Sequence, residues 1–274
     1  MRELDTNKAN TWCSGCGNFG IINAVKKAIH DLNAKEVGTD DIVITAGIGC
    51  HGKIFDYLNL SGIYGLHGRA LATAQGIKLA NPDLKIISFG GDGDSLGEGL
   101  EHTLFAAKRN MDITLILHNN GNYGLTTGQF SPLSFQGYKG LSTPFGSIEK
   151  PFDAVPLLIE AGATFVARAY SARIDHLCEM IVKAVQHKGF SFVEVLQPCV
   201  AYNNTYQLFN QKVKHLEIVP DKLSQALTLA RSTEDIYIGI FHQETRAVYH
   251  ELLYQDANPY RQRKSAAERR EHKA

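Results

Sequence analysis

The chain has 274 residues, of which 44% are apolar and 20% charged, and 28 Lys and Arg balance 28 Asp and Glu. This length fits one large α/β domain or two small ones, and the composition is typical of a soluble globular protein. The zero net charge argues against a general nucleic-acid-binding protein, and no apolar run approaches the roughly 20 residues of a membrane span.

The N-terminal region combines a polar start with a pair of cysteines. The first ten residues lack the apolar core of a secretion signal, which predicts a cytoplasmic protein. In cytoplasmic proteins, cysteines are more often thiols or metal ligands than disulfides. Cys13 and Cys16 form a C-x-x-C pair suited to zinc, iron–sulfur or thiol redox chemistry. The overlapping G-x-G-x-x-G lacks a preceding strand and does not indicate a dinucleotide site. Apolar residues from Ile21 to Leu32 then predict a helix facing the core.

A short apolar strand, 42–45, comes next and runs into a turn rich in small residues. Cys50 and Lys53 lie in this turn, and its small residues are typical of a backbone pressed against a ligand. His67 follows, just before an Ala-rich helix that ends at 81–83. A phosphate contact and a capping or core role are equally open for His67 on its own.

The stretch Gly91-Asp92-Gly93-Asp94 is the centre of a predicted βαβ unit. An apolar strand, 86–89, precedes it, and a helix, 98–108, and a second strand, 113–117, follow. Ligands of such units bind where the strands end. Gly91 and Gly93 leave bare backbone that a phosphate can approach. Asp92, together with Asn120 after the second strand, offers the oxygen ligands that Mg²⁺ prefers.

The remainder of the chain starts with a long loop, 123–150, rich in Gly, Ser, Thr and Pro. A loop of this length is usually functional or disordered, and we expect it to cover the ligand or contact a partner. Helix and strand patterns then alternate: a helix at 152–161, a strand at 164–167, a helix at 173–187 and a strand at 190–196.

The pattern changes after Ala201. We therefore expect a cofactor domain over 1–201 and a C-terminal extension over 202–274, packed on that domain or on a partner. The extension contains one more possible strand, 236–241, and a basic tail, 261–273. The default interpretation of the tail is a solvated segment, and docking on a partner subunit or on an acidic redox protein is the alternative. For the whole chain we expect an α/β fold with a mostly parallel sheet flanked by helices on both faces.

The five cysteines divide into two kinds. Cys178 lies inside a helical apolar pattern and fits a small core residue. The other four lie in turns marked by Gly or Pro, and four thiolates suit zinc or a [4Fe–4S] cluster. Structural zinc sites usually use two close pairs, whereas this chain has one, so the spacing favours the cluster. Separate buried thiols remain open. The turn cysteines are Cys13, Cys16, Cys50 and Cys199.

Several motifs in order resemble those of one family. They are W-C-x-G-C-G, G-I-G-C-x-x-K, L-H-G-R, G-D-G-D with a later N-N, Y-G-L-T-x-G-Q and Q-P-C. Between about Trp12 and Ala201 the chain resembles the β subunit of a 2-oxoacid:ferredoxin oxidoreductase, a thiamine-diphosphate-binding fold. Two positions depart from the family's pattern. Ser14 stands where the family often has Pro, and Asn122 stands where the family often has an apolar residue.

The resemblance implies a role for each matching position. Asp92 and Asn120 would bind Mg²⁺ through their side chains, and Asn122 through its backbone carbonyl. The four turn cysteines would hold one [4Fe–4S] cluster. Independently of the resemblance, Lys53 lies three residues after Cys50, and we expect it to receive the acid group of the substrate while Leu125 shapes the same end of the pocket; a solvated surface lysine is the alternative. Thiamine diphosphate would be lined by Ile48, Gly49, Cys50, His51, His67, Gly93, Asp94, Gly124 and Leu125.

The implied reaction is the oxidative decarboxylation of a 2-oxoacid, pyruvate or 2-oxoglutarate, with coenzyme A, passing electrons to ferredoxin, or the reverse. The catalytic Glu that acts on the cofactor's pyrimidine ring has no convincing candidate here. The resemblance places it on an α subunit, so we expect an inactive chain alone and an αβ or (αβ)₂ enzyme. Two rivals remain: a cluster-free thiamine-diphosphate decarboxylase or dehydrogenase component, and a non-catalytic zinc-bound scaffold.

Overall fold

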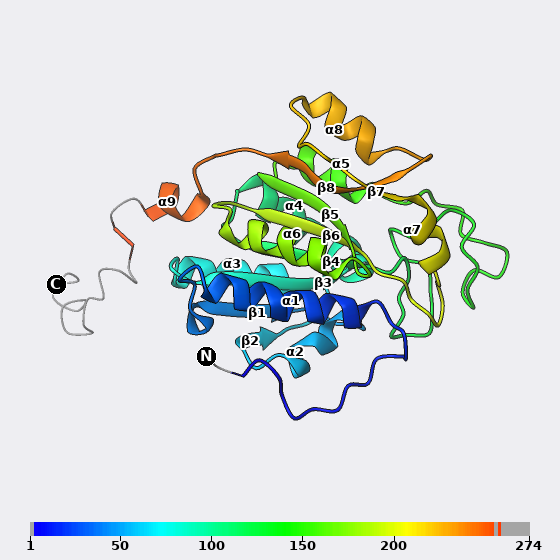
Figure 1. Ribbon diagram of the computed structural model, residues 1–274, viewed down its shortest axis with the longest axis horizontal. Helices are drawn as coiled ribbons and strands as arrows, with labels where there is room; N and C mark the ends of the chain where they lie inside the picture. The colour runs from blue at the N-terminus through cyan, green and yellow to red at the C-terminus, as the bar shows by residue number, and fades with distance from the viewer. Residues whose placement is uncertain (1–2, 255–256, 259–274) are drawn as a thin grey trace, which may run out of the picture.

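The computed structural model describes residues 3–254 and 257–258, and one sheet of eight strands runs through it (Figure 1). Neighbouring strands pair in parallel, except that β8 runs antiparallel to β5. In spatial order the strands are β2 (Ser61–Tyr64), β1 (Ile42–Ala46), β3 (Lys85–Gly91), β4 (Thr114–Asn119), β6 (Ser191–Leu196), β5 (Phe165–Tyr170), β8 (Ile236–Gln243) and β7 (Val213–His215).

Helices cover both faces of this sheet. The α-helices are α1 (Asn18–Asn33), α2 (Ile54–Tyr57), α3 (Ala70–Ala80), α4 (Leu100–Lys108), α5 (Ala154–Glu160), α6 (Ile174–Gln186), α7 (Tyr206–Lys212), α8 (Leu223–Ala230) and α9 (Tyr249–Tyr254). Single turns η1 (Thr39–Asp41) and η2 (His51–Lys53) precede β1 and α2. None of the helices that the structure describes is long and apolar enough to cross a membrane.

Alternate residues of the central strands face two separate cores. Ile87 and Ile116 pack with α1 and α6 on one face, while Ile86 and Leu115 pack with α3, α4, α5 and α8 on the other. Successive side chains of a strand point to opposite faces, so a sheet covered on both sides needs continuous apolar runs. The expected mostly parallel sheet flanked by helices is therefore confirmed.

The structure differs from the expectations in several short elements. Every residue of β2 is exposed, so its sequence carries no burial pattern. The helix expected from residue 98 is preceded by a π-helical turn, η3 (Asp94–Glu98), closed by a 2.8 Å bond from Gly99 N to Asp94 O. Such π turns are frequent at functional sites. In line with packing of the C-terminal extension on the cofactor domain, β7 and β8 join the same sheet, and β8 contains the strand expected at 236–241. The basic tail, 261–273, lies outside the described residues.

The order of the strands places a crevice between β1 and β3. The chain leaves β1 for β2 on one side and then crosses to β3 on the other. Ligands of open parallel sheets bind at such a switch point, beyond the carboxyl ends of the strands. The long loop between β4 and α5 lies at one end of the sheet, beside α7 (Figure 1).

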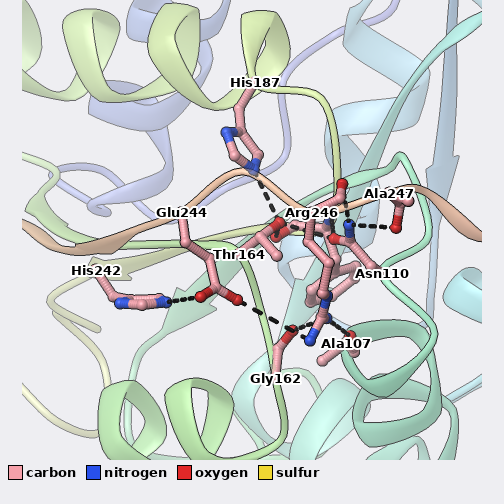
Figure 2. A network of polar contacts seen from close by, with 10 residues as sticks. Ala107, Asn110, Gly162, Thr164, His187, His242, Glu244, Arg246 and Ala247 are labelled. Carbon is pink, nitrogen blue, oxygen red and sulfur yellow. Dashed lines mark hydrogen bonds and ion pairs between the residues drawn. The ribbon is translucent and has the colours of Figure 1, made fainter. Parts of the chain in front are cut away.

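A buried asparagine fastens the segment that follows β8. Asn110 lies just after α4 with a left-handed backbone, φ 47°. Its Oδ1 accepts bonds from Thr164 Oγ1 at 2.7 Å and from Phe190 N at 2.8 Å, and its Nδ2 donates to the carbonyls of Arg246 and Ala247 (Figure 2). The Asn110 side chain therefore joins the α5–β5 connection, the α6–β6 connection and the segment after β8.

Candidate functional site

A cavity opens at the carboxyl ends of β1, β3 and β4, at the switch point of the sheet. All of the residues predicted to line the cofactor or bind magnesium meet here. Gly91, Tyr123 and Thr126 also line it. The full lining is Ile48, Gly49, Cys50, His51, His67, Gly91, Asp92, Gly93, Asp94, Asn120, Asn122, Tyr123, Gly124, Leu125 and Thr126.

Asp94 organises the loops around this cavity. Its buried Oδ1 accepts bonds from Gly68 N at 2.7 Å and from Ile48 N at 3.2 Å, and its Oδ2 lies 3.5 Å from His51 Nε2. A side chain at Gly47 would place its Cβ 2.2 Å from the Asp94 carboxylate oxygens, so glycine is required there. Asp94 therefore holds the loops that follow β1 and β2 in one arrangement.

Asp92 lies at the end of β3 and is almost fully buried. Burial raises the pKa of its carboxyl to about 6, against the opposing effect of a hydrogen bond that Ser131 Oγ donates to Asp92 Oδ2. A buried carboxylate with this little hydration is well suited to a cation.

The asparagines at the end of β4 form a tight turn. Asn120 Oδ1 accepts a bond from Asn122 N at 3.0 Å, and Asn122 Nδ2 donates to Asn120 O at 2.9 Å. Asn203 Nδ2 also donates to Asn120 O, at 2.9 Å. The turn therefore presents amide and carbonyl oxygens beside Asp92.

Three buried polar atoms at the cavity lack a hydrogen-bond partner among the described residues: His51 Nε2, Asp94 Oδ2 and Asn122 Oδ1. Buried polar groups are normally satisfied, and His51 Nε2 and Asp94 Oδ2 lie 3.5 Å from each other, so Asn122 Oδ1 is the atom that most clearly indicates a polar ligand. One carboxylate, several neutral oxygens and glycine backbone fit Mg²⁺ bound together with a diphosphate. The residues present therefore fit magnesium and thiamine diphosphate.

A second cavity adjoins the first and contains the four turn cysteines, Cys13, Cys16, Cys50 and Cys199. Cys50 lines both cavities. Burial raises the pKa of the Cys16 thiol to about 11, and the other three cysteines add to the effect. Cys178 lies elsewhere, in α6, with its Sγ 3.6 Å from Asp31 Oδ2. The structure thus separates the cysteines as the sequence patterns did.

Hydrogen bonds hold the cysteine loops together. Trp12 Nε1 donates to Cys50 O at 2.6 Å, and Gly17 N to Pro198 O at 3.1 Å. Gln197 Nε2 lies 3.6 Å from Cys16 Sγ. Three separate parts of the chain are therefore fixed around one cavity.

No three His, Cys, Asp or Glu side chains in the described residues are close enough to hold a single metal ion. A single zinc ion draws its four sulfurs to about 2.3 Å from one centre. In a [4Fe–4S] cluster each cysteine binds a different iron, so the sulfurs surround a larger object. The four cysteines that line one cavity give the number of thiolates that such a cluster needs.

The two residues predicted to select the substrate lie apart. Leu125, 46% exposed, lines the cofactor cavity. Lys53 lines the cysteine cavity instead, and its Nζ donates to Thr11 O at 3.3 Å. Their roles stay predictions.

Several residues at or beside the site have no sequence pattern that indicates their contacts. Trp12 and Tyr123 occur in the quoted motifs, but their partners come from distant segments. Ser131 lies in the long loop, where no periodicity marks it. His118, fully buried in β4, contacts Asn18 Oδ1 at 2.8 Å through Nδ1, and burial holds its pKa well below its usual value. Only the three-dimensional contacts reveal these positions.

The fold and the site together define a thiamine-diphosphate-binding domain. In agreement, the family described as thiamine pyrophosphate enzyme, C-terminal TPP binding domain, matches residues 47–195. The family that describes the C-terminal part of the pyruvate ferredoxin oxidoreductase beta subunit matches residues 199–257.

Individual relatives show which family of thiamine-diphosphate-binding proteins the chain is similar to. A 2-oxoacid:ferredoxin oxidoreductase subunit beta from Sulfolobus sp is 42% identical, over 94% of this chain and 92% of the relative. A 2-oxoglutarate synthase subunit KorB from Methanocaldococcus jannaschii is 41% identical over 76% of this chain and 75% of the relative. The solved 2-oxoglutarate:ferredoxin oxidoreductase from Magnetococcus marinus, with 2-oxoglutarate, coenzyme A and succinyl-CoA bound, superposes with a TM-score of 0.89 at 30% identity, covering 96% and 90%. The chain belongs to the family of 2-oxoacid:ferredoxin oxidoreductase β subunits.

Proposed function

We propose that this β subunit binds thiamine diphosphate, Mg²⁺ and one [4Fe–4S] cluster, and that together with an α subunit it performs the coenzyme A-dependent oxidative decarboxylation of a 2-oxoacid. Electrons pass to ferredoxin, and the reverse reaction uses the same site. One observation carries the proposal: Cys50 lines both the cofactor cavity and the cysteine cavity. A residue shared by the two cavities supports a short path for electrons from the site of oxidation to the cluster.

The cofactor cavity supplies the groups for carbon chemistry. Bound thiamine diphosphate supplies the nucleophilic carbon and the electron sink for decarboxylation. Asp92, Asn120 and the Asn122 carbonyl would hold Mg²⁺, which would neutralise the charge of the diphosphate. His67, 4.0 Å from Asp94 through Nε2, stands where it can contact phosphate. The other predicted lining residues shape the cavity around the ring system.

The cysteine cavity supplies the electron route. Cys13, Cys16, Cys50 and Cys199 each bind one iron. Burial raises the pKa of the Cys50 thiol, and the nearby Lys53 ammonium works against that effect. The Lys53 charge therefore favours the thiolate that iron requires.

The active site is complete only when an α subunit is present. Asp92 and Asp94 are the acidic residues that line the cofactor cavity, and both already accept hydrogen bonds. Asp92 is assigned to Mg²⁺, and Asp94 Oδ1 holds the loops after β1 and β2. We therefore infer that the carboxylate that acts on the pyrimidine ring comes from the α subunit. The β chain is inactive alone and works in an αβ or (αβ)₂ assembly in the cytoplasm.

The choice of 2-oxoacid depends on Lys53 and Leu125. The ammonium of Lys53 receives the distal carboxylate of 2-oxoglutarate from the side of the cysteine cavity, and Leu125 shapes the cofactor cavity. The relatives and the solved neighbour named for 2-oxoglutarate support this substrate, and pyruvate is the second candidate.

Activity of the separate and combined subunits tests the proposal. The β chain and the αβ complex are purified without oxygen and supplied with 2-oxoglutarate or pyruvate, coenzyme A and ferredoxin. Ferredoxin reduction that needs both subunits and coenzyme A is the expected result. Turnover by the β chain alone, or turnover by the complex that leaves ferredoxin oxidised, would contradict it.

A further inference from the structure

Ser131 connects the long loop after β4 to the Asp92 carboxylate. Its side chain is buried, with 3% exposure, and its hydroxyl donates to Asp92 Oδ2. The neighbouring Ser134 is equally buried, and its hydroxyl donates to Gly121 O at 2.6 Å. Ser134 Oγ in turn accepts a bond from Ser131 N at 2.7 Å. The two serines therefore fasten one loop to the strand ends that carry Asp92 and Asn120.

The Ser131 bond affects how Asp92 can bind a cation. A carboxylate can bind through one oxygen or through both. The hydroxyl of Ser131 occupies Oδ2, and the backbone amides of Asp92 and Gly93 also donate to this carboxylate. A metal that binds through both oxygens would have to displace the Ser131 bond. Mg²⁺ is small and requires near-octahedral geometry with short bonds, whereas the larger Ca²⁺ accepts carboxylates that bind through both oxygens.

We propose that Ser131 is a positioning and specificity-determining residue, which restricts Asp92 to one-oxygen binding and so favours Mg²⁺ over Ca²⁺. This inference rests on the proposed magnesium and thiamine diphosphate site. Outer-shell partners of ligating carboxylates commonly change metal affinity by 10–100-fold when removed.

Ser134 provides a matched control for a purely structural role. It fastens the same loop, and its hydroxyl donates to the Gly121 carbonyl and not to the Asp92 carboxylate, although its Oγ also lies 3.3 Å from Ser131 Oγ. If Ser131 only kept the loop in place, Ser131→Ala and Ser134→Ala would weaken both cations alike. If Ser131 restricts Asp92, only Ser131→Ala changes the preference between them.

The test uses the αβ complex, freed of divalent cations and saturated with thiamine diphosphate. Titration calorimetry with MgCl₂ and with CaCl₂ gives the ratio of the two dissociation constants for wild type, Ser131→Ala and Ser134→Ala. We expect Ser131→Ala to bind Mg²⁺ at least about tenfold more weakly and to shift the ratio toward Ca²⁺ by a similar factor. Ser134→Ala should keep the wild-type ratio.

Each possible result either supports or overturns the role proposed for Ser131. An unchanged ratio in Ser131→Ala, or the same shift in Ser134→Ala, overturns the inference. If Ser131→Ala does not fold, Ser131→Cys replaces it, because a thiol is a weak donor of similar size and should give an intermediate ratio. A wild-type ratio in that variant also overturns the inference. Failure of wild type to bind Mg²⁺ with thiamine diphosphate would instead contradict the proposed function.

Discussion

The indole Nε1 of Trp12 donates a hydrogen bond of 2.6 Å to the backbone carbonyl of Cys50. This bond joins the N-terminal cysteine loop to the loop that lines both cavities. Tyr57 and Phe19 pack edge-on against the indole, with ring centroids 4.9 and 5.6 Å away. The distance between the two proposed redox groups therefore depends on a side chain that binds neither of them.

We expect Trp12→Phe to weaken the cluster site while the fold persists. The variant leaves the Cys50 carbonyl unpaired, which costs about 1–3 kcal/mol. Iron release to a chelator, followed by absorbance in the αβ complex, should become faster. Phe19→Leu is the control, since it disturbs the same aromatic packing without breaking the bond. Wild-type iron retention in Trp12→Phe would contradict this prediction.

The cysteines should respond in two groups. Serine in place of Cys13, Cys16, Cys50 or Cys199 should lower the bound iron, because each thiolate is expected to hold one iron. Cys178→Ser should keep all of it. Iron and sulfide analysis of the five anaerobically purified variants measures this. Iron loss in Cys178→Ser, or none in the other four, would refute the assignment.

Lys53→Ala should affect 2-oxoglutarate more than pyruvate. The bond to Thr11 O uses one of the three N–H donors of Lys53, so the ammonium can still receive a carboxylate. A bond to a charged group contributes about 1.5–3 kcal/mol, so KM for 2-oxoglutarate should rise about tenfold or more. Steady-state kinetics test this, with Lys108→Ala on α4 as the control. An unchanged KM for every 2-oxoacid would remove Lys53 from substrate selection.

Asn110 offers a way to separate side-chain from backbone effects. Asn110→Ala removes the bonds to Thr164 and Phe190 and forces Ala into a left-handed backbone, at about 3 kcal/mol or more in total. Asn110→Gly loses the same bonds, but glycine adopts φ 47° without strain. Thermal unfolding should therefore rank wild type above Asn110→Gly above Asn110→Ala. Equal Tm values for the two variants would show that the backbone conformation contributes nothing.

His176 on α6 should make stability fall in acid. Burial, with a contribution from the nearby His215, lowers its pKa from 6.5 to about 4. The unfolded chain then binds the proton more readily, so stability is complete above pH 6.5 and is lost as the pH falls toward 4. Glu179 and Lys183 also face this group and act in opposite directions.

The pH dependence of Tm measures this effect. His176→Gln should lose less Tm than wild type between pH 6.5 and 4. His30→Gln, which changes an exposed histidine on α1, should behave as wild type. The same acid slope in wild type and His176→Gln would rule out a contribution from His176.

The sequence was sufficient for the parallel sheet and for the gathering of the lining residues. Continuous apolar runs such as 86–89 can be buried only between two layers, and parallel strands bring their carboxyl ends to one edge. The contacts of Ser131 and Trp12 were not predictable, because each bond spans 38 residues or more of chain and no local pattern encodes it. The strand β2 was not predicted, because all of its residues are exposed and its sequence shows no alternation of apolar and polar residues.

Metal and cofactor analysis of the anaerobically purified αβ complex tests the central claim most directly. We expect about four irons, matching sulfide and one thiamine diphosphate for each β chain. Thiamine diphosphate without iron would favour a cluster-free decarboxylase or dehydrogenase component. Zinc without thiamine diphosphate would contradict the account and indicate a non-catalytic scaffold.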